Sequence, residues 1–255
     1  MIEACAVVPV YEHGRVVAGT TARLRSLGLT VFLVDDGSGP ECAAELRRLA
    51  GADPAVRLLR LPVNRGKGAA VKAGLLAAAQ AGFTHALQID ADGQHDAADV
   101  PRFLAAAALE PGTLVCGRPV FDATIPRHRL YLRYLTHAMV WLNTLSFDIP
   151  DSMCGLRVYP LAVVLPVIAA EAPGDRMDFD VEVLVRLHWH GVRMRWLPTR
   201  VGYPLDGVSH FLPVRDNWLI TRMHTRLFFG MLWRAPALLA HRVRAAFTAS
   251  PGVTT

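Results

Sequence analysis

Leu-Gln-Ile-Asp-Ala-Asp-Gly-Gln-His, at residues 87–95, is an apolar run that stops abruptly at two carboxylates. The apolar part resembles a buried strand, and open α/β sheets bind their ligands beyond the carboxyl ends of such strands. Asp90 and Asp92 are one residue apart, so on an extended chain they point the same way and can converge on one cation. Carboxylate oxygens suit Mg²⁺ or Mn²⁺, which usually bind together with a phosphate. A solvated Asp-rich turn explains this stretch equally well when it is taken alone.

The residues around this stretch alternate between strand patterns and helical patterns. Strands are predicted at 4–10, 31–34, 56–61 and 84–89, and helices at 15–27, 40–50 and 66–81. Pro40 followed by Glu41 marks the start of one helix, and Gly82 suits the end of another. Strands that alternate with helices indicate βαβ units. The sequence therefore predicts an α/β fold with a mainly parallel sheet and helices on both faces.

The alternation is less regular in the second half of the chain. Helices are predicted at 101–108, 127–145 and 180–189, strands at 113–116 and 192–197, and an irregular turn and strand over 151–159. We find no internal repeat and no low-complexity linker, so no clean domain boundary is visible. A chain of 255 residues fits one α/β domain, with or without an appendage.

Composition and cysteine spacing bear on the compartment. The hydrophobic content of 52% is high, but no apolar run reaches the roughly 18 residues that a membrane-spanning helix requires. Glu3 comes directly before the first strand, and no basic region precedes an apolar core, so a secretory signal is not expected. The four cysteines are widely spaced and form no Cys-x-x-Cys pair, which favours a reducing, cytoplasmic setting.

The C-terminal segment at 213–255 has a different character. Its arginines are interleaved with apolar and aromatic residues, and they are Arg215, Arg222, Arg226, Arg234, Arg242 and Arg244. This pattern favours amphipathic helices in a membrane interface, with the guanidinium groups at the lipid phosphates. The alternative is a purely structural role, in which a C-terminal helix packs on the core and has its arginines on the solvent-exposed face. A surface for single-stranded nucleic acid is a weaker alternative, and we expect no nucleic acid partner.

Acidic side chains also follow two other predicted strands. Glu12 comes after the first strand, and Asp35 and Asp36 come after the second. The carboxyl ends of these strands meet at one edge of a doubly wound sheet, so five carboxylates are expected there. Crowded carboxylates repel each other and raise each other's pKa. A divalent cation, together with donors from a bound base and ribose, would remove that conflict. Ordinary polar turns explain one such cluster but not three.

Four motifs follow one another in the chain. They are Val8-Pro9-Val10-Tyr11-Glu12, Val34-Asp35-Asp36-Gly37-Ser38, Asn64-Arg65-Gly66-Lys67-Gly68 and Asp90-Ala91-Asp92-Gly93-Gln94-His95. As an ordered set they resemble the family 2 glycosyltransferases of GT-A fold, especially the branch that contains the dolichol- and polyprenyl-phosphate sugar synthases. The resemblance covers residues 4 to about 200 and implies a GT-A domain over 1–212. It also implies inverting transfer from a nucleotide-diphosphate sugar by direct displacement, with Mg²⁺ or Mn²⁺ as the cofactor.

The resemblance also implies roles for single residues. Asp36 would accept a hydrogen bond from the base, with Tyr11 and Glu12 near the base and ribose. The metal would act as a Lewis acid on the leaving diphosphate. The residues expected at the nucleotide sugar are Pro9, Tyr11, Glu12, Asp36, Lys67, Asp90, Ala91, Asp92, Arg118 and Arg157. The residues expected at the metal are Asp90, Asp92, Gln94 and His210.

The acceptor side is less well defined. An acceptor hydroxyl needs a general base, whereas a phosphate acceptor is already ionised. Residues 176–182 resemble the acidic segment that opens a helix at the family's acceptor site, with Asp180 at the position of the catalytic base and Asp178 as its neighbour. A structural N-cap is an equally good account of either residue. Structural ion pairs compete for Arg118 and Arg157, and a structural role competes for His210.

These observations predict a glycosyltransferase that acts on a lipid or polyprenyl-phosphate acceptor at the cytosolic face of a membrane, as a peripheral protein. A sugar nucleotidyltransferase is one alternative, but it needs a Gly-rich basic loop after the first strand, where this chain has Pro9, Tyr11 and Glu12. A membrane-bound scaffold with a degenerate nucleotide site is the other. The intact carboxylates Asp36, Asp90 and Asp92 argue against it.

Overall fold

The computed structural model describes residues 2–120, 127–202 and 213–248. In this part of the chain, seven strands form one sheet in the order β3-β2-β1-β4-β6-β5-β7. The strands are β1 (Ala4–Val10), β2 (Thr30–Asp35), β3 (Val56–Arg60), β4 (His85–Gln88), β5 (Leu114–Val120), β6 (Arg157–Pro160) and β7 (Met194–Arg200). Only β6 runs against its neighbours, β4 and β5; the other pairs in the sheet are parallel. The predicted α/β fold with a mainly parallel sheet is confirmed.

One face of the sheet is covered by α1 (Gly14–Ser26), α2 (Pro40–Ala52) and α4 (Val100–Leu109), with the short 3₁₀ helix η1 (Ala97–Asp99) before α4. These helices bury apolar side chains against alternate residues of the strands. Leu24, Leu46 and Phe103 are fully buried in this layer. Burial of each such side chain contributes about 1.5–3 kcal/mol to folding.

The opposite face is covered by α3 (Lys67–Gln80), α6 (Leu161–Glu171) and α7 (Phe179–Trp189). Small residues let α3 approach the sheet closely. A side chain at Gly74 would meet Val34 Cγ2 at 3.0 Å and would also collide with Val7. The helix therefore lies almost on β1 and β2, and this sets the position of Lys67 in its first turn.

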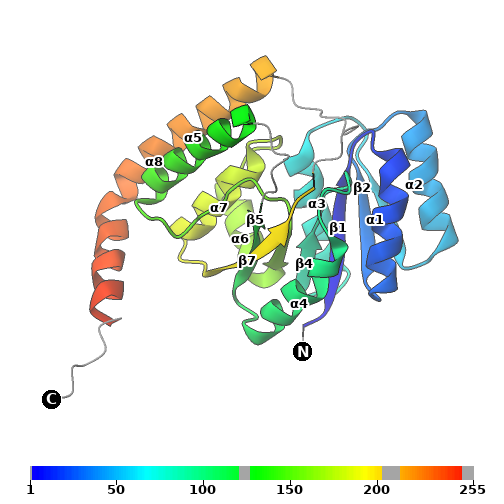
Figure 1. Cartoon of the computed structure of the whole chain (residues 1–255), viewed down its shortest axis with the longest axis horizontal. Coiled ribbons are helices and arrows are strands. Elements are labelled where there is room, and N and C mark those ends of the chain that lie inside the picture. The colour runs from blue at the N-terminus through cyan, green and yellow to red at the C-terminus, as the bar shows by residue number, and fades with distance from the viewer. Residues whose placement is uncertain (1, 121–126, 203–212, 249–255) are drawn as a thin grey trace.

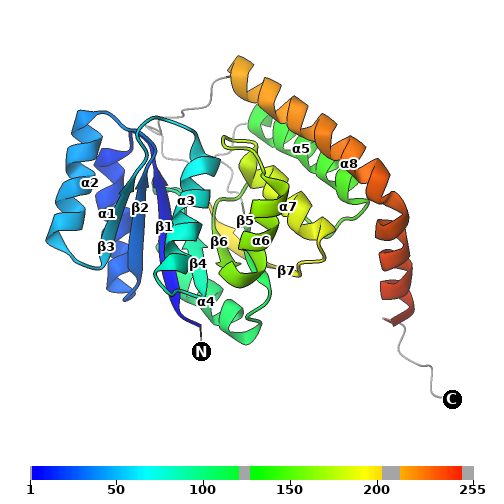
Figure 2. The ribbon, with the colours of Figure 1, turned by 180° about the vertical axis from the view of Figure 1, so that it is seen from behind.

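Two further helices, α5 (Arg127–Thr144) and α8 (Pro213–Thr248), lie side by side outside this layer (Figure 1 and Figure 2). Met223, Leu227 and Met231 of α8 are buried, and Met223 and Leu227 belong to the same hydrophobic cluster as side chains of α3, α6 and α7. Residues 213–248 thus form one long helix, and its buried side chains contribute to the core. A stripe of its residues packs against the protein, as the structural alternative expects, and contact of this helix with a membrane stays a prediction.

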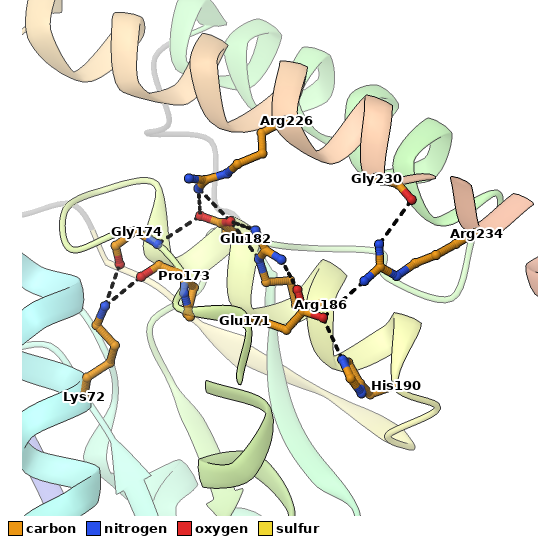
Figure 3. Close-up of polar contacts among 10 residues, drawn as sticks. All are labelled: Lys72, Glu171, Pro173, Gly174, Glu182, Arg186, His190, Arg226, Gly230 and Arg234. Carbon is orange, nitrogen blue, oxygen red and sulfur yellow. Dashed lines mark hydrogen bonds and ion pairs between the residues drawn. The ribbon is translucent and has the colours of Figure 1, made fainter. Parts of the chain in front are cut away.

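α8 is attached to the core by charge as well as by apolar contact (Figure 3). Both oxygens of Glu182, which is fully buried in α7, lie 2.7 Å from Arg226 Nη2, and Glu182 also binds Arg186. Arg234 Nη2 lies 3.2 Å from Glu171 Oε1 at the end of α6. Two of the arginines expected at lipid phosphates therefore pair with carboxylates of the protein instead.

Some elements differ from the sequence-based predictions. β5 continues to Val120, so Arg118 lies inside a strand, opposite Pro198 of β7, and not at the strand's end. α6 was not predicted, because its residues are apolar almost throughout and show no helical stripe. Among the described residues, no helix has the length and apolar character needed to cross a membrane.

Candidate active site

The three acidic strand ends lie together at one edge of the sheet. β1 lies between β2 and β4, and all three run parallel, with Val10 opposite Asp35 and Val7 opposite Gln88. The turns that follow them therefore emerge side by side. This brings Glu12, Asp36 and Asp90 to the same edge, as the alternation of strands and helices predicts.

The turns after β1 and β2 are joined by Glu12. Its backbone has φ +56°, which is uncommon for a residue other than glycine. The Glu12 N–H donates to Ser38 Oγ (3.1 Å), and Glu12 Oε1 accepts from the Gly39 N–H (2.6 Å). These bonds hold an unfavourable backbone conformation at a site where strained residues tend to be functional.

Asp36 organises the loop after β3. Its Oδ1 accepts from the Arg65 N–H and its Oδ2 from the Gly66 N–H, both at 2.8 Å, and the residue is 2% exposed. Burial raises the pKa of Asp36 despite these two hydrogen bonds. The carboxylate thus positions the segment that leads directly into Lys67, in addition to any contact with a base.

Lys67 bridges two carboxylates. Its Nζ lies 2.8 Å from Asp90 Oδ1 and 2.8 Å from Asp180 Oδ2. Burial opposes ionisation of both Lys67 and Asp90, but their mutual attraction is stronger: the pKa of Asp90 is held below its usual range and that of Lys67 above it. His95 Nε2 lies 3.8 Å from Asp90 Oδ2 and favours the same charged form of Asp90.

Asp92 differs electrostatically from Asp90. Its Oδ1 accepts from the Gln94 N–H at 3.0 Å. Burial, together with the charge of Asp90, raises the pKa of Asp92. A carboxylate that is costly to ionise alone is stabilised when a divalent cation binds it. Asp92 is therefore the residue here that gains most from a cation.

The side chains fit a divalent cation shared with a diphosphate. In the described ranges no three His, Cys, Asp or Glu side chains gather closely enough to hold a metal by themselves. Mg²⁺ and Mn²⁺ at nucleotide sites need only one or two carboxylates, because the phosphates supply further oxygens. Asp92 would be the principal ligand, with Asp90 and Gln94 beside it, because Asp90 is already paired with Lys67.

Asp180 and Arg157 lie deeper than the resemblance implied. The Arg157 side chain is 1% exposed and donates to the carbonyls of Cys154 and Ser152 and to the Tyr159 hydroxyl. Its Nη1 also lies 3.7 Å from Asp180 Oδ1. The guanidinium is committed to the interior, so the structure gives Arg157 a structural role and does not present it to a diphosphate.

Asp180 is likewise held by Lys67, Arg157 and the Gln88 amide, with Gln88 Nε2 at 3.3 Å. Asp178 is as buried as Asp180, and each residue is 6% exposed. It accepts from the Arg176 N–H at 3.1 Å, and burial raises the pKa of its carboxyl. Asp178 forms no ion pair among the described residues, whereas Asp180 lies against both Lys67 and Arg157.

An open groove of about 1090 Å³ runs from the acidic edge along α1 and α2. Glu12, Asp92 and Gln94 line its inner end, and Arg15, Arg23 and Arg48 are among the residues farther along it. Asp36, Lys67 and Asp90 do not line it. We place the chemistry at the strand ends rather than in the groove as a whole, because the paired and perturbed charges cluster there.

The remaining predicted residues are placed as follows. Pro9 lies in β1, Tyr11 is half-buried just beyond it, and Ala91 is buried between the two carboxylates. Arg118 is exposed on β5. His210 lies outside the described residues.

Sequence reasoning assigned no role in the site to Gln88, Tyr159 or His95. Tyr159 Oη donates to Gln88 Oε1 at 3.0 Å, and Gln88 in turn donates to Asp180. A glutamine inside an apolar strand is the signal that could have revealed this buried network, because a buried amide requires partners.

A parallel sheet with carboxylates at the ends of β1, β2 and β4, next to an antiparallel β6, is the architecture of the GT-A glycosyltransferases. Two of the solved structures with a similar fold contain a bound nucleotide sugar and Mn²⁺. Glucosyl-3-phosphoglycerate synthase from Mycobacterium tuberculosis, in complex with Mn²⁺ and UDP-Glc, is 14% identical with a TM-score of 0.63, over 90% of this chain and 79% of that one. A mannosyltransferase from Pyrobaculum calidifontis in complex with GDP-Man and Mn²⁺ is 15% identical with a TM-score of 0.53, over 98% of this chain and 76% of that one.

The sequence comparisons show the family. The family model for glycosyl transferase family 2 matches residues 5–165, and the chain belongs to that family. A dolichyl-phosphate beta-glucosyltransferase from Dictyostelium discoideum is 30% identical over 80% of this chain, which spans 64% of that enzyme's length. An undecaprenyl-phosphate mannosyltransferase from Micrococcus luteus is 30% identical over 68% of this chain and 74% of its own.

Proposed function

We propose that this glycosyltransferase moves a sugar from a nucleotide-diphosphate sugar to a lipid or polyprenyl phosphate, with inversion, at the cytosolic face of a membrane. The observation that carries the proposal is the convergence of Glu12, Asp36, Asp90 and Asp92 at the ends of three adjacent strands. The two relatives whose names contain a polyprenyl or dolichyl phosphate support a lipid-linked acceptor.

In this reaction an acceptor oxygen forms a bond to the anomeric carbon while the bond from that carbon to the diphosphate breaks. A phosphate acceptor is already an anion, so no base has to remove a proton from it. Negative charge grows on the leaving diphosphate, and a divalent cation at Asp92 would supply Lewis-acid stabilisation there. Lys67 keeps Asp90 ionised and fixes the positions of both Asp90 and Asp180, because its ammonium group lies 2.8 Å from an oxygen of each.

The outer surface of α5 and α8 supports a peripheral position on a membrane. Large apolar side chains are exposed on both helices, among them Leu135 (63%), Trp218 (65%), Phe229 (65%) and Trp233 (86%). Exposed aromatic side chains with arginines nearby are typical of helices that lie in a lipid interface. We prefer this function to a sugar nucleotidyltransferase, because the β1 turn lacks the basic Gly-rich loop that such an enzyme needs.

A thermal-shift panel of UDP and GDP sugars, with and without Mn²⁺, tests the donor half of the proposal. A ligand that binds only the native state stabilises it and so raises the melting temperature. At a ligand concentration one hundred times the dissociation constant, the free energy of unfolding rises by about 2.7 kcal/mol. We expect at least one nucleotide sugar to stabilise the protein, and to do so more strongly with Mn²⁺. If none of them raises the melting temperature under either condition, the proposed donor site is wrong.

A further inference from the structure

A second charged site lies beside the segment that carries Lys67. Five arginines surround a hollow of about 320 Å³, here called the arginine basin: Arg65, Arg176, Arg215, Arg222 and Arg226. Two come from loops next to the acidic edge, and three come from the first half of α8. Its volume is at the lower end of the range for small-molecule sites, about 300–1,000 Å³. It suits a small anionic group better than a whole nucleotide sugar.

The residues that form the walls of the basin are held in place by hydrogen bonds and ion pairs within the protein. Arg176 Nη1 donates to Asn64 Oδ1 at 3.1 Å, and Arg226 is held by Glu182. Glu182 Oε2 also accepts from the Gly174 N–H, while Lys72 Nζ donates to the carbonyls of Pro173 and Gly174 (Figure 3). The segment at 173–174 is therefore fastened from both α3 and α7, so the basin is preorganised.

Two of the five guanidinium groups are available. Arg215 and Arg222 are exposed, are two helical turns apart on one face of α8, and form no ion pair within the described part of the chain. The two carboxylates of the basin are both engaged: Asp175 by Arg65 and Lys72, and Asp178 by the Arg176 N–H. The basin thus has an excess of positive charge. Guanidinium groups bind phosphate oxygens through short, charge-assisted and often bidentate hydrogen bonds.

The basin adjoins the proposed reaction centre. Arg65 precedes Lys67 by two residues, and Asp178 precedes Asp180 by two. The two segments interlock: a side chain at Gly66 would meet Asp175 O at 2.5 Å, and one at Gly68 would meet Gly174 O at 2.7 Å. The same pair of segments therefore presents Lys67 and Asp180 to the acidic edge, and Arg65 and Asp178 to the basin.

Apolar surface begins at the edge of the basin. Val214 (87% exposed) and Trp218 (65% exposed) lie next to Arg215 in the first turns of α8, and Leu219 lines the basin itself. Basic and apolar side chains so close together match an amphiphile that carries a phosphate on a hydrocarbon chain.

We propose that the arginine basin binds the phosphate group of the lipid acceptor, with Arg215 and Arg222 as the residues that contact it. The assignment rests on the proposed function. It adds to that function the place where the acceptor's charge is held and the element, α8, that supplies the contacts.

The kinetic test uses the full chain with Arg215→Gln and Arg222→Gln together, and Arg47→Gln as the matched control. Arg47 is an exposed arginine on α2 that lines neither the basin nor the groove. With farnesyl phosphate as acceptor, we expect the double variant to raise the acceptor KM at least about tenfold and to leave the donor KM unchanged. Arg47→Gln should change neither constant. An acceptor KM that is the same in the double variant and the wild type overturns the assignment.

Binding without transfer distinguishes the possible sources of the phosphate. Tryptophan fluorescence is titrated with farnesyl phosphate, farnesol, inorganic phosphate and phosphatidylglycerol vesicles, for the wild type and the double variant. The assignment requires that farnesyl phosphate binds at least about tenfold more tightly than farnesol or inorganic phosphate, and that the double variant loses this advantage. If vesicles bind through the same two arginines and farnesyl phosphate does not compete, the basin holds a bilayer headgroup and the assignment is wrong.

The two proposals fail in different ways. If the wild type binds farnesyl phosphate through Arg215 and Arg222 but transfers no sugar to any lipid phosphate, the proposed function fails and the anion site remains. If the wild type transfers sugar and the double variant does so with the same acceptor KM, only the site assignment fails.

Discussion

Lys67 is the residue on which the charge balance of the acidic edge depends. Its side chain is 17% exposed and its ammonium group lies between Asp90 and Asp180, whose side chains are 22% and 9% exposed. Two carboxylates that share one cation in a poorly solvated place are stable only while that cation is present. The position of Lys67 follows from the close approach of α3 to the sheet at Gly74.

Replacing Lys67 with methionine should therefore destabilise the protein. We expect Lys67→Met to lower the free energy of unfolding by about 3 kcal/mol at pH 7, because two partly buried carboxylates lose their partner. Urea denaturation measures the change, and Lys67→Arg, which keeps the charge, should cost less. A loss of stability no greater than that of an exposed substitution, about 0.5 kcal/mol, would contradict the bridging role.

Asp92→Asn tests the metal assignment. We expect transfer to fall at least about a hundredfold, because the substitution removes the charge that would hold a cation at the leaving diphosphate. The melting temperature should change little, since Asp92 forms no ion pair within the described residues. Asp96→Asn is the matched control: Asp96 is exposed four residues farther along and caps η1 through the Ala98 N–H, which asparagine can also do. Initial rates with Mn²⁺ measure both variants.

For single residues, the sequence predicted where a side chain lies in the fold better than it predicted which side chains it contacts. The position of Asp36, Asp90 and Asp92 at one edge follows from strands that end in acids, and the structure places them there. The bridge from Lys67 to Asp180 could not be predicted, because no local pattern links residues so far apart in the chain. For Arg157 the sequence left a phosphate ligand and a structural ion pair open, and burial with four internal contacts favours the structural role.

α8 is the element whose environment differs most from the sequence-based expectation. His224 lies on its buried side, 6% exposed, with Nδ1 3.2 Å from the side-chain amide of Asn143 in α5. Its Nε2 is buried without a hydrogen-bond partner among the described residues. Burial lowers the pKa of His224 to about 4, and the charge of Glu182 only partly opposes that shift.

The docking of α8 should consequently depend on pH. The folded pKa of about 4 is lower than the ordinary value of 6.5, so the unfolded chain binds the proton more readily. The stability that neutral His224 contributes is fully present above pH 6.5 and is lost as the pH falls toward 4. We expect a loss of up to about 3 kcal/mol across this window.

Thermal melts followed by circular dichroism, at intervals between pH 7 and pH 4, measure this loss. The comparison is with His224→Leu, which keeps an apolar volume and cannot be protonated. The difference in stability between the two proteins should move in favour of the variant as the pH falls. A constant difference would show that His224 does not control the docking.

Some helices and strands were predicted correctly from the sequence and others were not, and the difference has a physical reason. The first four strands and three helices alternate between clear periodicities, so their order follows from the sequence. α6 shows no such contrast, because apolar residues occur around most of its circumference. β5 continues for three residues past a glycine, because β7 pairs with it along its whole length. The residue at which a strand such as β5 ends is therefore decided by pairing with a strand that is distant in the sequence. A local sequence pattern contains no information about that pairing.

On the scale of the whole molecule, apolar surface is concentrated on the α5–α8 layer. Besides the side chains already described, Tyr134, Leu142 and Phe147 are exposed in or just after α5, and Leu232 and Leu239 in α8. Removing residues 213–255 is not a clean test of membrane binding, because Met223, Leu227 and Met231 of α8 are buried in the core. Substitutions on the exposed side of the helix avoid this problem.

Phe229→Ser combined with Trp233→Ser should weaken binding to phosphatidylcholine–phosphatidylglycerol vesicles at least about tenfold, since each large apolar side chain contributes about 1.5–3 kcal/mol when it is fully buried. Sedimentation with vesicles measures the partition. Leu109→Ser is the matched control, because Leu109 is 76% exposed at the end of α4, on the opposite face of the sheet. Equal losses in the control and the double variant would rule out a specific membrane face.

The late position of α8 in the chain has a consequence for biosynthesis. A ribosome adds about 5–20 residues each second, so the strands of the acidic edge are complete seconds before Met223, Leu227 and Met231 are made. Once α5 and α7 have been made, their apolar sides have no cover until α8 follows. A nascent chain with this apolar surface exposed can bind a chaperone or the bilayer itself. Translation that stalls before α8 would leave an intermediate that is prone to aggregate.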